Sequence, residues 1–251
     1  MRTVAIIQAR MASTRLPGKI MADLAGKPLL YHVVSRALQA RTLDLVALAT
    51  TDRSIDDEVA KLCDELGIPC FRGSEEDVLD RYYQAAKYFD ADVVVRLTAD
   101  CPMIDPLIID KVVQVLIEED FEYVSNILDC TYPDGLDTEA FYRKVLERAW
   151  REANLKSDRE HVTTYLRNHP EWFRLKNVSH TENLSSFRWT VDEPQDLEFV
   201  RRVYEYLGPD NSFGMTEILA LLQKYPELKD INTGINRNEG YQKALTEDTL
   251  I

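Results

Sequence analysis

The first half of the chain alternates between short apolar runs and stretches in which apolar residues recur at helical spacing. Runs rich in Val, Ile and Leu without polar alternation are typical of strands buried on both faces of a sheet. We expect such strands at residues 3–9, 44–51, 69–73 and 91–100. We expect helices between and after them, at residues 28–40, 54–67, 76–89 and 105–119. This order predicts the α/β class, a mostly parallel central sheet flanked by helices with ligands at the carboxyl ends of the strands.

The pattern loosens in the second half of the chain. Residues 129–138 are rich in turn formers, and the segments that follow suggest further helices and two returning strands. The expected helices lie near 139–153, 158–168, 193–208 and 216–224, and the strands at 173–178 and 186–192. The last stretch, 226–251, is polar and is expected to be a surface tail. Without a repeat or a low-complexity linker, residues 1–251 are expected to form a single domain.

Charge narrows the choice of ligand. The chain has 43 acidic and 30 basic side chains and a net charge of -13, which argues against a nucleic-acid binder. An anionic ligand must therefore meet locally concentrated positive charge. Residues 1–22 supply it, because they hold Arg2, Arg10, Arg15 and Lys19 and no acidic residue.

The cysteines and the apolar runs indicate the cellular compartment. The four cysteines show no C-x-x-C spacing, and no histidines are placed to complete a zinc site, so they are expected to be reduced thiols. The first apolar run is too short for a signal peptide, and no run approaches the length of a membrane span. We expect a cytoplasmic protein with no membrane partner.

The basic loop follows the first expected strand, in the sequence QARMASTRLPGK. A loop that leads from a parallel strand towards a helix commonly cradles phosphates. It is neither G-x-G-x-x-G nor G-x-x-x-x-G-K-[ST], so the dinucleotide and P-loop interpretations lack their defining residues. It does offer the hydroxyls of Ser13 and Thr14, backbone N–H groups near Gly18, and three cations, equipment that suits a triphosphate. Solvated surface charge is the alternative.

The stretch QARMASTRLPGKIMADLAGKPLLYHVV closely resembles the cytidylyltransferase family that makes CMP-sugars, including the sialic-acid and Kdo activating enzymes. Together with GSEEDVLDRYYQAA it is similar to the spore coat polysaccharide biosynthesis protein F branch of that family. The resemblance runs from about Arg2 to Leu207. It implies a GT-A-like nucleotidyltransferase that transfers CMP from CTP to a hydroxyl of a sugar or sugar acid, releasing pyrophosphate, for surface polysaccharide or glycan synthesis.

The resemblance assigns roles to the loop. Arg10, Ser13, Arg15 and Lys19 would contact the phosphates, and Ala9 would place backbone beside the base. Lys19 and Arg15 would act in catalysis by offsetting charge on the departing pyrophosphate. Each of these two cations could instead be a charge on a flexible surface loop.

Phosphoryl-type transfer requires a divalent ion, and Mg²⁺ takes oxygen ligands from a few carboxylates and from substrate. Asp100 and Asp192 each follow an expected strand and match the metal-binding aspartates of the family by resemblance. Either could instead cap a helix or form a turn. The sequence LTADCP stands where the Kdo enzymes carry Gln-Gly-Asp, so the nucleotide base is less certain than the reaction class.

The irregular region 126–178 is where the family builds its sugar pocket and dimer contacts. Arg159 and His161 resemble acceptor contacts, and Asp134 and Asp137 could bind acceptor hydroxyls or merely form a turn. The region also carries many aromatic residues on few expected strands. We therefore expect it to be an acceptor and dimerisation excursion whose aromatics are covered in a homodimer. The residues in question are Tyr132, Phe141, Tyr142, Trp150, Tyr165, Trp172 and Phe173.

Two other functions remain open. A glycosyltransferase of the same fold would use a D-x-D metal motif, and Asp90 to Asp92 reads DAD, but it precedes its strand, at the wrong end for a site. A catalytically silent nucleotide-binding scaffold of polysaccharide assembly is the second alternative. The presence of Lys19, Asp100 and Asp192 argues against a scaffold. The acceptor cannot be identified from the sequence.

Overall fold

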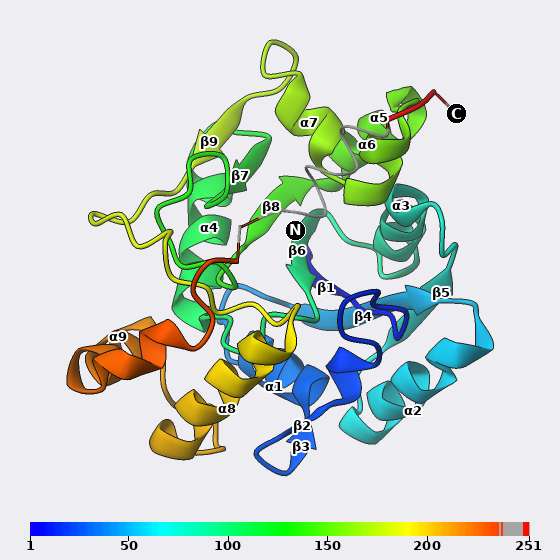
Figure 1. The fold of residues 1–251 in the computed structure, drawn as a ribbon. Coiled ribbons are helices and arrows are strands. Elements are labelled where there is room, and N and C mark those ends of the chain that lie inside the picture. Colours follow the sequence, from blue (N-terminus) through cyan, green and yellow to red (C-terminus); the bar gives the residue numbers. More distant parts are fainter. Residues whose placement is uncertain (236, 238–247, 251) are drawn as a thin grey trace.

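A mostly parallel central sheet organises the computed structural model, which describes residues 1–235, 237 and 248–250 (Figure 1). The strand order is β5-β4-β1-β6-β8-β7-β9, and a separate two-stranded ribbon pairs β2 with β3. The strands are β1 Thr3–Gln8, β2 Asp23–Leu24, β3 Lys27–Pro28, β4 Leu45–Thr51, β5 Cys70–Gly73, β6 Val93–Thr98, β7 Tyr123–Ser125, β8 Glu139–Tyr142 and β9 Leu175–Asn177. The α/β class with a mostly parallel sheet is confirmed.

Helices cover both faces of this sheet. They are α1 Leu29–Ala37, α2 Asp57–Leu66, α3 Val78–Tyr88, α4 Pro106–Glu118, α5 Arg143–Glu152, α6 Lys156–His161, α7 Thr164–Asn168, α8 Pro194–Leu207 and α9 Met215–Lys224. Short 3₁₀ helices lie at η1 Lys19–Met21, η2 Ser54–Asp56 and η3 Pro226–Asp230.

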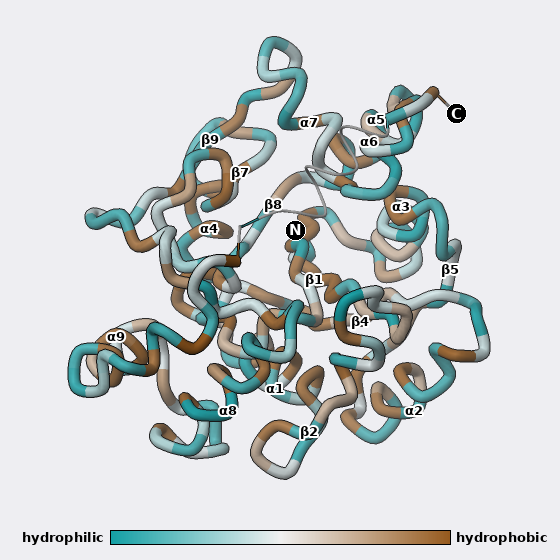
Figure 2. Tube along the Cα trace, viewed as in Figure 1, coloured by the Kyte–Doolittle hydropathy of each residue, from teal (hydrophilic) through white to brown (hydrophobic). Residues whose placement is uncertain are grey.

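The apolar runs form strands because both of their faces are buried. Along β1, Ala5 and Ile7 belong to one hydrophobic cluster, whereas Val4 and Ile6 belong to the cluster on the opposite face. In Figure 2 the brown, hydrophobic residues gather around β1 while teal residues predominate on the outer loops. A strand with a cluster on each side has no position for polar alternation, which explains the continuous run.

The parallel half of the sheet brings its strand ends into line. Strand β1 pairs in parallel with β4 on one side and with β6 on the other. Gln8, the last residue of β1, lies opposite Ala49 and Thr98. Because β1 and β6 end at the same level, the basic loop after β1 starts beside the segment that carries Asp100.

The other half of the sheet departs from the expectation. Strand β8 runs antiparallel between β6 and β7, and β9 lies parallel to β7. A helix was expected from residue 139, which is wrong: the helix begins at Arg143 and the four residues before it are β8. The buried Glu139 pairs with Arg96 on the neighbouring strand, and this non-local ion pair draws its segment into the sheet.

Two more elements differ from the sequence expectation. The helix expected at 158–168 is broken into α6 and α7 at Val162, whose φ is 59°. The strand expected at 186–192 is not formed. Among the described residues, this segment makes only an isolated bridge between Arg188 and Asp134. Its backbone bonds go to loops instead: Trp189 donates to the carbonyl of Asp134 and Val191 to that of Asp100.

The segment expected to be a surface tail contacts the domain at several of its described residues. Leu228 and Asn232 are each 6% exposed, and Arg237 pairs with Asp137. Hydrogen bonds from Asn232 and Arg237 therefore hold residues 226–235 and 237 to the domain surface. Residues 236, 238–247 and 251 lie outside the described part.

The aromatics of 126–178 pack on their own chain, because β8 and β9 place that region within the main sheet. Trp172 is the exception, at 47% exposed. Tyr132, Phe141, Tyr165 and Phe173 are buried, and Tyr142 and Trp150 pack against the clusters. The expectation that a second subunit covers these aromatics is therefore wrong for most of them.

Candidate active site

The loop after β1 folds back on itself before Lys19. The N–H of Gly18 donates to the carbonyl of Met11 at 3.1 Å, and the N–H of Met11 donates to Asp56 Oδ1 at 2.7 Å. Gly18 has a φ of 70°, a left-handed conformation that favours glycine. The turn at Gly18 lets Lys19 open η1 with its side chain directed into the sheet end.

The Lys19 ammonium joins the end of β6 to the segment that carries Asp192. Its Nζ donates to Asp100 Oδ2 at 2.9 Å, to Asp192 Oδ1 at 2.8 Å and to the carbonyl of Val191 at 2.8 Å. Lys19 is only 8% exposed. Burial alone would lower its pKa, but the two carboxylates outweigh that effect and raise it. Lys19 is therefore a fixed cation.

Asp100 follows β6 and stays ionised. Burial opposes its charge, but Lys19 and a hydrogen bond from Thr98 outweigh burial and lower the pKa of Asp100 to about 2. Its carbonyl accepts from the N–H of Val191 at 2.8 Å. This backbone bond brings the segment that carries Asp192 to the end of β6, which sequence separation alone does not reveal.

Asp192 is surrounded by cations. Beyond Lys19, its Oδ1 lies 2.9 Å from Arg15 Nη2 and its Oδ2 accepts from Arg188 Nη2 at 3.0 Å. Arg188 also donates from Nε to Asp196 Oδ1 at 2.8 Å and from Nη1 to Asp134 Oδ2 at 3.2 Å. Sequence reasoning missed Arg188. The alternation of side chains along an extended segment could have found it, because Arg188 and Asp192 lie four residues apart and so on the same side of that segment.

Gly135 joins the turn-rich loop to the Asp192 segment. Its φ is 105°, and a Cβ at this position would come within 2.6 Å of Thr190 N and of Trp189 C. The close approach lets the Trp189 N–H bond the carbonyl of Asp134. Only glycine satisfies both the backbone conformation and the space, so this residue fixes the approach of Asp134 to Arg188.

The predicted nucleotide-binding residues line one cavity of about 350 Å³. It falls within the size range of small-molecule sites. Besides the two aspartates, its lining includes His161 and Glu160 from α6. The predicted residues brought together there are Ala9, Arg10, Ser13, Arg15, Lys19, Asp100 and Asp192.

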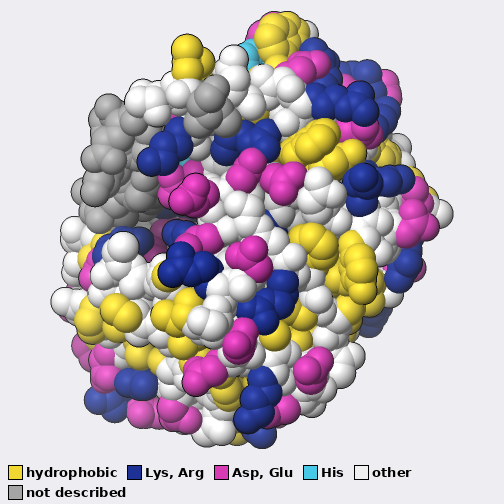
Figure 3. All heavy atoms as spheres, turned by 90° about the vertical axis from the view of Figure 1, so that its right-hand side faces the viewer, with side chains coloured by type: hydrophobic (Ala, Val, Ile, Leu, Met, Phe, Trp, Pro, Cys, Tyr) yellow, Lys and Arg dark blue, Asp and Glu magenta, His cyan; other side chains and the backbone are white. Residues whose placement is uncertain are grey.

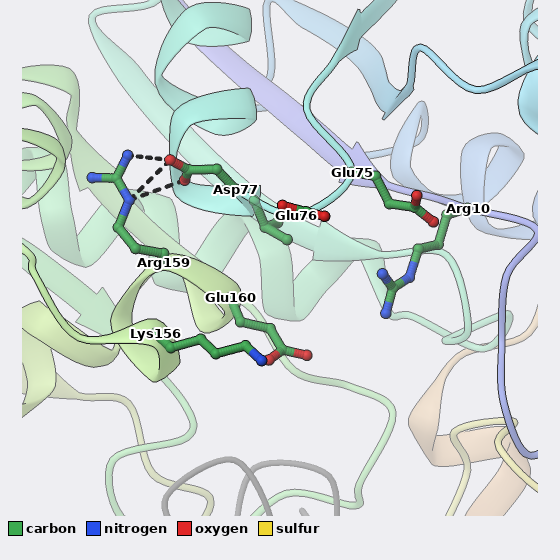
Figure 4. A pocket seen from close by; sticks show the side chains of 8 residues that line it. Arg10, Glu75, Glu76, Asp77, Lys156, Arg159 and Glu160 are labelled. Carbon is green, nitrogen blue, oxygen red and sulfur yellow. Dashed lines mark hydrogen bonds and ion pairs between the residues drawn. The ribbon is translucent and has the colours of Figure 1, made fainter. Parts of the chain in front are cut away.

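A second hollow, of about 640 Å³, adjoins the first and shares Arg10 and Glu160 with it. Figure 4 shows Arg10 on one side of it and Arg159 on the other, with the Arg159 guanidinium turned toward Asp77. Arg159 does not face the aspartates of the first cavity: its Nε donates to both carboxylate oxygens of Asp77 at 3.0 Å. Asp77 also caps α3 by accepting from the N–H of Asp80.

The four residues predicted for acceptor binding are therefore divided between two places. Arg159 and His161 lie on the Arg10 side, at the two cavities. Asp134 and Asp137 lie among Arg188 and Arg237, and Arg188 links Asp134 to Asp192. Burial and then the neighbouring Asp137 raise the pKa of Asp134 to about 7.

The donor set at Lys19 fits a hard divalent ion. Asp100 and Asp192 supply carboxylate oxygens within reach of one point, and both remain partly accessible at 26% and 20%. Within the described part of the chain, no three or more His, Cys, Asp or Glu side chains gather around a common point. Mg²⁺ is usually held by one or two carboxylates with substrate phosphates and water, so two carboxylates suit it.

Other predicted features can be placed as well. Basic and acidic side chains are interspersed over the face seen in Figure 3, so no one-sign surface forms there. The DAD sequence ends one residue before β6, at the opposite end of that strand from Asp100. All four cysteines are free thiols. None of the described helices has the length and apolar character needed to cross a membrane.

Comparison with known proteins identifies this architecture. A family model described as cytidylyltransferase matches residues 4–217. An uncharacterized protein of Methanocaldococcus jannaschii is 36% identical, the alignment covering 97% of this chain and 99% of that one. The spore coat polysaccharide biosynthesis protein SpsF of Bacillus subtilis is 34% identical over 88% of this chain and 94% of its own. A cytidylyltransferase structure from Leptospira borgpetersenii superposes with a TM-score of 0.89 at 31% identity, covering 94% of this chain and 100% of that one. The chain belongs to the cytidylyltransferase family and is a nucleotidyltransferase.

Proposed function

We propose that this enzyme transfers CMP from CTP to a hydroxyl of a sugar or sugar acid and releases pyrophosphate. The observation that carries the proposal is the Lys19 ammonium, held 2.9 and 2.8 Å from Asp100 and Asp192 at the floor of a cavity lined by the basic loop. A fixed cation beside two ionised carboxylates suits a polyphosphate that arrives with a divalent ion.

Each part of this site has a task in that reaction. Asp100 and Asp192 would hold Mg²⁺, which would neutralise charge on the phosphates. Arg10, Arg15 and Lys19 bind the triphosphate and stabilise the negative charge that accumulates on the departing pyrophosphate. Ser13 offers a hydroxyl to a phosphate oxygen. The acceptor hydroxyl attacks the α-phosphorus directly, so no side chain acts as nucleophile.

The two adjoining cavities give the nucleotide a direction. Phosphates at Lys19 leave the nucleoside to extend past Arg10, which belongs to both linings. The backbone at Ala9 lines the same path. The acceptor then approaches from the Arg188 side of Asp192, because Arg188 links Asp192 to Asp134. The Bacillus subtilis relative is named as a spore coat polysaccharide biosynthesis protein, which supports a product destined for surface polysaccharide.

The test is a pyrophosphate-release assay with each of the four ribonucleoside triphosphates and Mg²⁺ against a panel of sugars, sugar acids and phosphonates. We expect release with CTP and at least one sugar or sugar acid. A clear preference for UTP or GTP would contradict the choice of nucleotide. Release of a nucleoside diphosphate from a nucleotide sugar would instead identify the glycosyltransferase alternative. No release with any pair of nucleotide and acceptor would favour the scaffold.

We further propose that the enzyme is a homodimer. Most aromatics of 126–178 pack on their own chain, so the support comes from Trp172. Its exposed indole stacks on His169 with 4.2 Å between ring centres. Light scattering at micromolar concentration should give twice the 28.9 kDa chain mass. A mass of one chain would contradict the proposal.

A further inference from the structure

The C-terminal segment, described at residues 226–235 and 237, reaches the acceptor side of the site. It lies beyond residues 4–217, the part that the family model matches. Asn232 is 6% exposed, and its Nδ2 donates to the carbonyl of Arg188 at 2.9 Å and to Asp196 Oδ1 at 3.0 Å. These two bonds anchor the segment to the same network that holds Asp192.

Arg237 continues this segment into the site. Its Nη2 donates to Asp137 Oδ1 at 2.5 Å, and its Nη1 donates to the carbonyl of Tyr132 at 3.2 Å. Its Nε lies 3.7 Å from Asp134 Oδ1. The guanidinium therefore lies against both aspartates that the sequence suggested for acceptor hydroxyls.

These contacts extend a chain of ion pairs from the reaction centre. Asp192 pairs with Arg188, Arg188 with Asp134, and Asp134 and Asp137 both with Arg237. Exposure changes along this chain: the Arg188 side chain is 7% exposed and that of Asp137 is 29% exposed. Arg188 is fixed by its neighbours, whereas Asp137 at the outer end remains open to a ligand.

Charge explains why a cation is needed at this point. Burial first, and then the other aspartate of the pair, raises the pKa of Asp134, and the Arg237 guanidinium opposes that rise. Burial also raises the pKa of Asp137, again against Arg237. Two crowded carboxylates without this cation would favour protonation, and a protonated acid is a poorer acceptor for a hydroxyl.

We propose that Arg237 is a positioning residue of the acceptor side, which holds Asp134 and Asp137 as an acceptor pair for the hydroxyls of the incoming sugar. This inference rests on the proposed function and adds a specificity element from outside the matched family region. The ligand class is a polyhydroxylated sugar, and the shared chemistry is a pair of hydroxyls donating to two carboxylates.

The test compares Arg237→Gln, which removes the charge, with Arg237→Lys, which keeps it. Arg202→Gln is the matched control, because Arg202 lies on the exposed side of α8 and forms ion pairs there with Glu198 and Glu205. With the nucleotide and sugar found in the release assay, Arg237→Gln should raise the acceptor KM about tenfold or more, as expected for a charge-assisted contact. The KM for CTP should change less than about twofold, and Lys should recover part of the loss.

Double substitution tests whether Arg237 acts through Asp137. If it does, Arg237→Gln combined with Asp137→Asn should cost little more than either change alone. An acceptor KM that is unchanged in Arg237→Gln would overturn the inference while leaving the proposed function intact. Equal rises in both KM values, without recovery by Lys, would show a merely structural role and would also overturn it.

A binding measurement separates this inference from the proposed function. Saturation-transfer NMR with glucose, N-acetylglucosamine and 3-deoxy-manno-octulosonate detects sugar contact without turnover. If the wild type releases no pyrophosphate with any pair, the proposed function fails. The Arg237 inference then stands only if a sugar signal is present in the wild type and in Arg202→Gln and is lost in Arg237→Gln. Equal signals in these proteins, or none, would overturn it.

Discussion

The phosphate end and the acceptor end of the site are built differently. At the phosphate end, the basic loop and Asp100 follow two neighbouring parallel strands, and one ammonium gathers the carboxylates at 2.9 and 2.8 Å. At the acceptor end, Asp134 and Asp137 lie on a turn whose position depends on Arg188 and Arg237, far along the chain.

The difference separates chemistry that one topology fixes from chemistry that tertiary ion pairs fix. Parallel strands of similar length end at one edge, so polar residues placed just after them must meet. The turn at Asp134 has no such constraint and is held by the Asp192 segment and the C-terminal segment. We therefore expect substitutions at the phosphate end to affect turnover directly and those at the acceptor end to act through position.

The largest effect should come from the proposed metal ligands. Asp100→Asn and Asp192→Asn each remove a ligand charge with little change in size, and each should lower Mg²⁺-dependent turnover at least about 1,000-fold. Pyrophosphate release with CTP measures this, and circular dichroism should show an unchanged fold.

Asp90→Asn is the matched control for these two changes. It is the same chemical substitution at an exposed turn before β6, where φ is 52° and asparagine is well tolerated. Its turnover should equal that of the wild type. Near-normal activity in Asp100→Asn or Asp192→Asn would remove that residue from the mechanism.

The glycine that joins the two ends comes next. Gly135→Ala would place a methyl group 2.6 Å from the backbone at residues 189 and 190, at a φ of 105°. It should lower the free energy of unfolding by about 3 kcal/mol or more, combining backbone strain with a steric clash. Urea denaturation measures the change.

Gly67→Ala separates strain from clash. Gly67 has a positive φ of 67°, but a Cβ there would meet nothing within 4 Å. We expect it to cost about 1–2 kcal/mol, the conformational part alone. Equal losses at the two glycines would mean that the backbone of the Asp192 segment yields to the new methyl group, and that Gly135 does not fix the acceptor turn.

Much of the phosphate end could be predicted from the sequence. Continuous apolar runs predicted β1, β4 and β6, and the residues immediately after β1 and β6 line the cavity as expected. That inference is local, because each side chain needs only its own strand to reach the edge of the sheet. Asp192 is the exception, since its segment was expected to be a strand and is held by Val191 and Gly135 instead.

The acceptor end could not be predicted in the same way. Glu139 belongs to a sequence with helical character, and its pairing with Arg96 across the sheet makes it a strand residue. Arg237 lies in a polar stretch that no periodicity distinguishes from a tail, and only its contacts with Asp137 and Tyr132 place it in the site. Ion pairs between residues 43 and 100 positions apart leave no local pattern.

A smaller effect should follow removal of the central cation at the phosphate end. Lys19→Ala should lower kcat/KM for CTP by an amount equivalent to about 1.5–3 kcal/mol, the value of an ionised contact. Part of this loss reflects repulsion between Asp100 and Asp192, which no longer share an ammonium between them. Lys229→Ala, on η3 away from the first cavity, is the control. An unchanged kcat/KM would return Lys19 to the class of structural cations.

The smallest effect concerns pH and tests the acceptor end. Burial, followed by repulsion from Asp137, raises the pKa of Asp134 to about 7, so this carboxyl loses its proton as pH rises from 6 to 8. The other charged groups facing it are Arg188, Arg237 and Asp192.

Only the ionised form accepts two hydroxyls well, so the sign follows: the acceptor KM should fall as pH rises through 7. We expect a change of a few-fold between pH 6 and pH 8, less than full titration of one isolated group would give, because Asp137 shares the ligand. Asp134→Asn cannot titrate and should show a flat acceptor KM over this range. A wild-type profile that is equally flat would mean that the acceptor does not contact Asp134, and that the ion pairs around it serve only to hold the turn.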